Sequence, residues 1–94
     1  MIKHIVCFKL KDGVDVKKTA DILRSMEGKV PTALKIEVGE DFLHSERSYD
    51  IILQVTLKDR NALDEYQNDP YHCSVVKKYM HEVRTASVAV DYDI

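Results

Sequence analysis

Strict alternation of apolar and polar positions opens the chain and predicts a β-strand over residues 2–10. The same period of two recurs in residues 34–38, 49–57 and 85–93, so the sequence predicts four strands. Because successive side chains point to opposite faces of a strand, each strand offers one face to a core. In the last strand the more apolar face is Ala86, Val88, Val90 and Tyr92, which alternates with Ser87, Ala89 and Asp91.

Apolar residues at helical spacing lie between the first two strands and again between the last two. They recur from Val16 to about Gly28, with Asp15 as an N-cap. Asp59 caps a short helix, and Asp69-Pro70 then supplies an N-cap and a first-turn proline for a further helix. The stripe expected on that further helix is His72, Val75/Val76, Tyr79 and Val83.

The resulting order of elements is β-α-β-β-α-β, in one domain of residues 1–94. This is the ferredoxin-like topology, an α+β fold with a four-stranded antiparallel sheet. Helices cover only one face of such a sheet, and the other face is too apolar here to remain in water. We therefore expect a homodimer formed through the open sheet faces. The residues expected on that open face are Ile5, Cys7, Ile52, Thr56 and Ala89 among Lys3, Gln54 and Asp91.

Charge and cysteine usage narrow the classes of partner. A net charge of −2 with interspersed basic and acidic residues leaves no basic patch, so no nucleic acid or membrane partner is expected. No apolar run reaches the roughly 20 residues that span a bilayer, and the cytoplasm is the expected location. Cys7 and Cys73 form no paired motif and are interpreted as reduced thiols.

Candidate chemistry lies at the break in the second helical segment, between Tyr66 and His72. Burial and a position near a helix start both favour a neutral imidazole at His72, which can accept a proton, whereas the Asp69 carboxylate opposes them. Tyr66 precedes the break and could orient His72 or donate to a developing oxyanion. His4 lies on the strand face expected to meet the helices, so the three polar side chains could converge.

A purely structural interpretation of the same residues stays open. Tyr66 and His72 could hydrogen-bond each other, or the backbone, and so set the angle of the helix break. His4 could be a satisfied core histidine, and Asp69 is foremost a helix cap. His44 lies in a polar loop and His81 on a mixed helical face, where both are expected to be solvated.

Metal and cofactor motifs are absent from the sequence. The four histidines include no pair at helical i,i+4 spacing and no HExxH motif, and no glycine-rich phosphate loop is present. We therefore expect no metal site and no cofactor.

Several short motifs spread along the chain point to one family. They are Met1-Ile2-Lys3-His4-Ile5-Val6, Val38-Gly39, Tyr49-Asp50, Tyr66…Pro70-x-His72 and Asp91-Tyr92. Together they resemble the stress-responsive A/B barrel domain, whose members are dimeric α+β barrels of two ferredoxin-like protomers. The resemblance covers essentially the whole chain and agrees with the dimer expected from the sheet.

The resemblance also implies a site. A plant relative is a polyketide cyclase, and its catalytic tyrosine and histidine correspond to Tyr66 and His72. The resemblance implies that His72 acts as general base, that Tyr66 orients it and contacts the oxyanion, and that His4 is a donor lining the pocket. The substrate pocket is expected to be lined by His4, Ile51, Val76 and Tyr79, with Leu23 and Val88 also affecting its size.

Two family positions differ in this chain, because Asp69 and Ile51 stand where histidines are found in relatives. The loss of a polar group at Ile51 argues against the cyclase's own substrate. Two functions therefore remain: a cofactor-free cyclase or lyase acting on a small carbonyl compound, and a non-catalytic dimeric module for ligand binding or stress response. A cofactor-independent monooxygenase or a haem-using relative is a third interpretation, which no residue favours.

Overall fold

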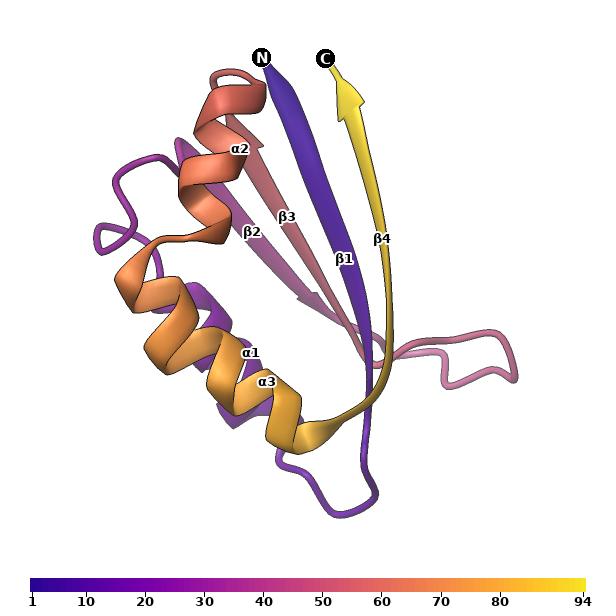
Figure 1. Ribbon diagram of the computed structural model, residues 1–94. Coiled ribbons are helices and arrows are strands. Elements are labelled where there is room, and N and C mark those ends of the chain that lie inside the picture. Colours follow the sequence, from indigo (N-terminus) through magenta and orange to yellow (C-terminus); the bar gives the residue numbers. More distant parts are fainter.

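A computed structural model describes all 94 residues, and a four-stranded antiparallel sheet forms one layer of the protein (Figure 1). The strand order is β2-β3-β1-β4, so β1 is central and β4 is an edge strand. The four predicted strands are thereby confirmed. Their bounds are β1 (Ile2–Leu10), β2 (Lys35–Glu40), β3 (Ile51–Leu57) and β4 (Arg84–Asp93).

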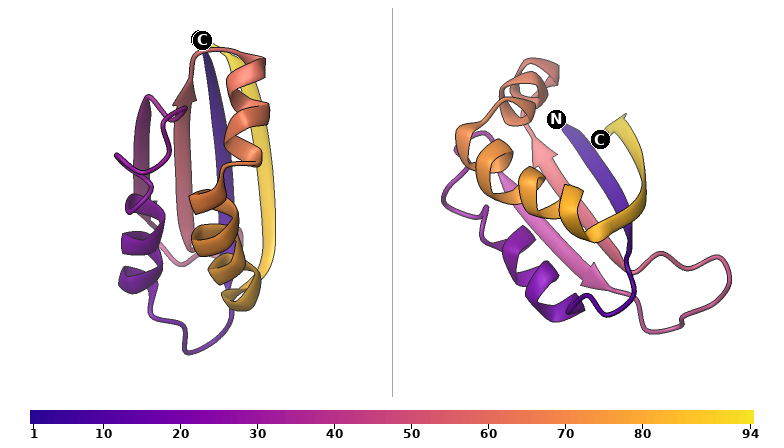
Figure 2. Two further views of the ribbon diagram at one scale, coloured as in Figure 1. Left: turned by 60° about the vertical axis from the view of Figure 1, so that its left-hand side comes forward. Right: turned by 60° about the horizontal axis from the view of Figure 1, so that its bottom comes forward.

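Helices form the second layer and all lie over one face of the sheet (Figures 1 and 2). The order of elements confirms the ferredoxin-like α+β fold, with the second helical segment broken in two. None of these helices has the length and apolar character needed to cross a membrane. The helical elements are α1 (Val16–Arg24), α2 (Arg60–Gln67), the π-helix η1 (His72–Lys77) and α3 (Lys78–Val83).

Aspartates begin the helical segments, as the sequence predicts. The side chains of Asp15, Asp59 and Asp69 each accept a hydrogen bond from the backbone N–H three residues further on, at 3.0, 2.8 and 3.0 Å. Each satisfies one donor that a helix start otherwise leaves unpaired. The first helix ends at Arg24 rather than near Gly28, and residues up to Val30 continue as turns.

The core fills the space between the two layers. Leu23, Met26 and Tyr66 from the helical side are fully buried against Val55 and Leu57 of β3. These are the apolar positions that alternate along the strand and recur along the helices, so the core follows the sequence pattern.

Strand β4 presents its apolar residues to the open face, contrary to the sequence-based expectation. Its register with β1 pairs Asp91 with His4 and Ala89 with Val6, which places these residues on the helix-covered face. The expectation failed because the more apolar face was assigned to the core, although the helices make few contacts with this edge strand. The residues that β4 contributes to the open face are Ala86 and three exposed apolar ones, Val88, Val90 and Tyr92.

Strand β2 extends through Gly39 to Glu40, beyond the predicted end at residue 38. A Cβ at Gly39 would lie 3.1 Å from Ile52 Cγ2, so a side chain here would crowd the neighbouring strand. The connection from β2 to β3 then projects beyond the edge of the sheet as an arm (residues 41–50; Figure 1). Within this arm Phe42 and Leu43 are exposed.

Candidate active site

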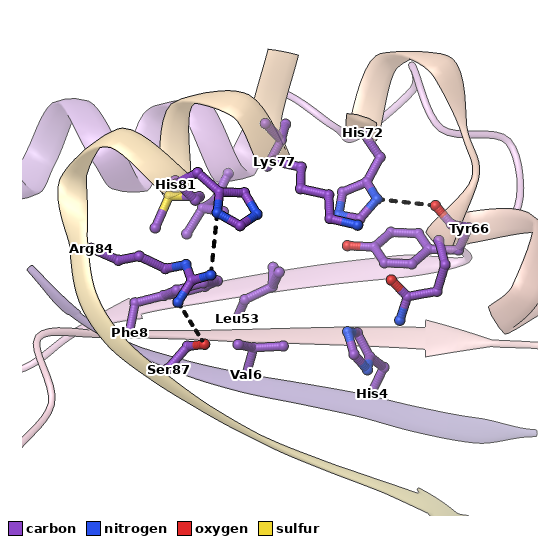
Figure 3. A pocket seen from close by; sticks show the side chains of 14 residues that line it. His4, Val6, Phe8, Leu53, Tyr66, His72, Lys77, His81, Arg84 and Ser87 are labelled. Carbon is purple, nitrogen blue, oxygen red and sulfur yellow. Dashed lines mark hydrogen bonds between the residues drawn. The ribbon is translucent and has the colours of Figure 1, made fainter. Parts of the chain in front are cut away.

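A cavity of about 220 Å³ lies between the sheet and the η1–α3 helical segment (Figure 3). Tyr66, His72 and His4 stand at one end, and apolar side chains of β1 and β3 form its floor. The structure therefore brings together the three polar residues that the sequence singled out. The complete lining is His4, Val6, Phe8, Leu23, Leu53, Tyr66, Gln67, His72, Val76, Lys77, Met80, His81, Arg84 and Ser87.

His72 is held by two hydrogen bonds at the helix break. Its backbone N–H donates to the Asp69 carboxylate at 3.0 Å, and its ring Nδ1 lies 3.1 Å from the Tyr66 carbonyl oxygen. Because a carbonyl oxygen only accepts, Nδ1 carries the proton and Nε2 of the neutral ring is the free acceptor. His72 therefore links the two helical segments across the break and also keeps a ring nitrogen that can accept a proton.

The surroundings of His72 favour its neutral form. Burial is the main cause that lowers the pKa of His72 from its usual value of 6.5, and the positive charge of Lys77 and the neighbouring His4 act in the same direction. The hydrogen bond to the Tyr66 carbonyl and the Asp69 carboxylate oppose this shift. The imidazole is therefore unprotonated at neutral pH, as a general base must be.

Tyr66 is fully buried and supplies an aromatic wall and a hydroxyl donor. Its ring stacks on the His72 ring, with centroids 4.4 Å apart and an interplanar angle of 26°. Its hydroxyl donates to Met26 Sδ at 3.6 Å, and a thioether is a weak acceptor. Burial, and to a smaller extent the Asp69 charge, raise the pKa of Tyr66, so the phenol stays protonated. No hydrogen bond joins the two side chains to each other.

His4, the second histidine of the site, is paired with Asp91. The Asp91 carboxylate on β4 accepts a hydrogen bond from His4 Nδ1, which fixes the orientation of a buried imidazole. The His4 and Tyr66 rings meet edge to face, with centroids 5.7 Å apart. From the sequence, Asp91 was expected on the open face, so this partner of His4 was missed. Only the register between β1 and β4 brings the two residues together.

The π-helical turn at η1 decides which helical residues reach the cavity. In a π-helix the hydrogen bonds run from i to i+5, so each turn holds more residues and the inward stripe shifts. From this helical segment the cavity is lined by His72, Val76 and Met80, at intervals of four residues, together with Lys77 and His81. The regular α-helical stripe of the sequence prediction includes Val76 but misses the residues that follow.

Two residues predicted to line the pocket lie outside it. Tyr79 turns toward α1, where its hydroxyl lies 3.3 Å from Thr19 Oγ1, because the π-turn rotates it away from the sheet. Ile51 is buried at the end of β3, paired with Phe8, whereas His4 pairs with Val55. The expectation that Ile51 and Tyr79 line this cavity is therefore wrong. Val88 is excluded as well, because it faces the open side of the sheet.

Polar residues at the other end of the cavity were not recognised from the sequence. His81, expected to be solvated, is exposed but lines the cavity, and Arg84 and Ser87 of β4 join it there. Lys77 lies between the two ends (Figure 3). No group of three or more histidine, cysteine, aspartate or glutamate side chains is arranged to hold a metal ion.

Comparison with known proteins identifies the family. The profile of the stress responsive A/B barrel domain matches residues 2–94. The chain belongs to the stress-responsive A/B barrel domain family. The match spans nearly the whole sequence, so this domain accounts for the whole structure described here. Among curated proteins, none matches the sequence.

Solved structures share the fold of this A/B barrel domain. A dimeric ferredoxin-like protein of unknown function from Bacteroides fragilis is 26% identical, covers 99% of this chain and 95% of its own, and has a TM-score of 0.84. An Arabidopsis thaliana protein is 18% identical over 100% and 95% of the two chains, with a TM-score of 0.86. The hydroxynitrile lyase of Passiflora edulis is 13% identical over 99% and 92%, with a TM-score of 0.83.

The shift of the His72 pKa predicts how stability depends on pH. Folding lowers the pKa of the His72 imidazole from its usual value of 6.5. Below that pH the unfolded chain therefore binds a proton more readily than the folded chain does. His72 therefore favours unfolding progressively as the pH falls below about 6.5. Urea unfolding between about pH 7.5 and about pH 5 should show wild type losing more stability than the His72→Gln variant. An equal loss in both proteins would contradict this origin.

Proposed function

We propose that this protein is a cofactor-free enzyme that catalyses a lyase or cyclase reaction on a small carbonyl compound. The observation that carries the proposal is the Nδ1–H bond of His72 to the Tyr66 carbonyl, which leaves Nε2 as an oriented base at the cavity. Tyr66 supplies a protonated hydroxyl beside it, with only a sulfur as partner. A base and a donor in one cavity are the two groups that enolate chemistry needs.

The reaction follows from these two groups. His72 Nε2 takes a proton from the carbon next to a carbonyl, and the electron pair of the broken C–H bond forms an enolate. The Tyr66 hydroxyl donates a hydrogen bond to the enolate oxygen and stabilises the charge there. In a cyclase, the enolate carbon then bonds to a second carbonyl carbon of the same molecule. The protonated His72 returns its proton to the new alkoxide.

Two further residues support this role. Asp91 orients His4 at the cavity wall, where the resemblance to the cyclase assigns a substrate contact; with Nδ1–H on Asp91, the neutral ring presents Nε2 to the cavity as an acceptor. A solved structure of the same fold is a hydroxynitrile lyase, so the fold accommodates lyase chemistry in that protein. For the present chain, His72, Tyr66 and His4 are the proposed site, with Val76 as a wall residue.

The test is proton exchange at an acidic carbon. Acetylacetone in deuterated buffer is followed by proton NMR with wild-type protein and with the His72→Gln variant. We expect wild type to accelerate loss of the methylene signal, through transfer of that proton to Nε2. Exchange no faster with wild type than with an equal concentration of the variant would contradict the proposal.

A non-catalytic ligand-binding or stress-response module is the second candidate. The cavity of about 220 Å³ favours a role without catalysis, because it is smaller than the roughly 300 Å³ at the low end of ordinary ligand sites and leaves little room for a substrate. On this alternative the His72–Tyr66 bond is only a joint between α2 and η1. Binding of a small ketone without any exchange at its carbon would support this candidate.

We further propose that the protein is a homodimer joined through the open sheet face. Val88 and Val90 of β4 are 50% and 61% exposed on this face, and Tyr92 is 45% exposed. Ile5 and Ile52 continue the apolar surface across the sheet. Several solved structures of this fold are described as dimeric, among them the protein from Bacteroides fragilis.

Val90→Lys is expected to dissociate the dimer. Burying one valine contributes about 1.5–3 kcal/mol, and a two-fold interface contains the substitution twice. Sedimentation velocity should show wild type as a dimer and this variant as a folded monomer. Val75→Lys changes an exposed valine on η1, outside the sheet, and should leave the dimer intact. A Val90→Lys protein that stays dimeric would place the interface elsewhere.

A further inference from the structure

The end of the cavity away from Tyr66 is a cluster of hydrogen-bond donors formed by His81, Arg84 and Ser87 (Figure 3). Arg84 Nη2 donates to His81 Nδ1 at 3.3 Å, and Arg84 Nη1 donates to Ser87 Oγ at 3.4 Å. Since Nδ1 accepts, the neutral His81 ring carries its proton on Nε2, and the Ser87 hydroxyl keeps its hydrogen for another partner. All three residues of this donor cluster therefore offer N–H or O–H groups.

The positive charges of Arg84 and Lys77 at this cavity are not paired with a carboxylate. No aspartate or glutamate lines the cavity. Neither Arg84 nor Lys77 has a carboxylate oxygen within 4.0 Å, although other basic side chains, such as Arg24 and Arg60, are paired. The residues that line the cavity carry a net positive charge, whereas the chain as a whole has a net charge of −2.

We propose that the ligand is a small keto acid, whose carboxylate binds the donor cluster while its carbonyl lies at Tyr66 and His72. This assignment rests on the proposed function and specifies its substrate class. A guanidinium presents parallel N–H groups that match a carboxylate, and charge-assisted bonds of this kind are the stronger ones. Between the two polar ends lie Val6 and Leu53, which suit a short hydrocarbon segment. Lys77 adds positive charge between the two ends of the cavity.

The proposal is tested by binding of levulinate and of its uncharged methyl ester, measured by isothermal titration calorimetry. Both molecules carry the same ketone, and only the acid carries the charge. We expect wild type to bind the acid about 10- to 100-fold more tightly, as a charged hydrogen-bonded pair provides. Arg84→Gln should remove that preference. Arg84→Lys should keep part of it, because lysine retains the positive charge but lacks the paired N–H groups of the guanidinium. The lysine variant also decides the question if the glutamine variant does not fold.

Arg60→Gln is the matched control, because Arg60 is a surface arginine of α2 paired with Asp93, outside the cavity. It should bind both compounds as wild type does. Equal affinity of wild type for acid and ester, or absence of binding of both, would overturn the proposal. So would a preference for the acid that survives in Arg84→Gln, or binding of inorganic phosphate as tight as that of levulinate.

The outcomes separate this proposal from the proposed function. Arg84-dependent binding of levulinate without exchange of acetylacetone would keep the carboxylate site and reject the catalytic role. Exchange of acetylacetone together with equal affinity for acid and ester would keep the catalytic role and reject the carboxylate site.

Discussion

Replacing His72 by glutamine is expected to slow the exchange of acetylacetone by about 10²- to 10⁴-fold, the usual contribution of a positioned general base. Glutamine retains a polar side chain of moderate size but has no nitrogen that accepts a proton at neutral pH. The rate is measured by proton NMR in deuterated buffer at saturating acetylacetone. Circular dichroism and sedimentation establish that the variant remains folded and keeps its oligomeric state.

A histidine elsewhere provides the matched control for this experiment. His44 lies on the exposed arm with its ring toward Asp41, and it does not line the cavity. His44→Gln should exchange acetylacetone at the wild-type rate. A folded His72→Gln protein with undiminished activity would remove His72 from the mechanism.

Tyr66→Ala is expected to cost about 3–5 kcal/mol of unfolding free energy, the range for truncation of a large buried aromatic residue. Tyr66 is 0% exposed, so no solvent-facing part of the ring escapes the loss. The stack on His72 and the edge contact with His4 disappear with the ring. Urea unfolding of wild type and variant measures the difference.

Tyr66→Phe separates the ring from the hydroxyl. It keeps the packing and removes one weak bond to Met26 Sδ, so the free energy of unfolding should change by less than about 1 kcal/mol. Exchange activity should nevertheless fall, because the enolate oxygen loses its donor. A loss of several kcal/mol in Tyr66→Phe, or a mild effect of Tyr66→Ala, would contradict the structural role assigned to the ring.

The location of the site followed from local sequence patterns. Asp69-Pro70 interrupts a helical segment, and the cap at Asp69 is a short-range interaction that depends on residues close in the chain. His72 and Tyr66 lie on either side of that break, and His4 lies on a strand whose alternation is regular. These features need no knowledge of distant contacts.

The composition of the site depended on contacts that no local pattern contains. The π-turn at η1 exchanged Tyr79 for Lys77 and His81 at the cavity, because one extra residue in a turn rotates all that follows. The sequence offered no clear sign of that insertion, since its apolar residues fit a regular helix equally well.

The sequence by itself determined the ferredoxin-like fold, the family, the helix caps and the pairing of Tyr66 with His72 in one region. These properties arise from periodicity and from neighbours in the chain. The tertiary structure decided the partners of the site: Asp91 beside His4, and Arg84 with Ser87 at the far end. Both depend on how β4 faces the helices. The alternation along β4 does not say which of its faces lies on the helix side, and only its register with β1 decides this.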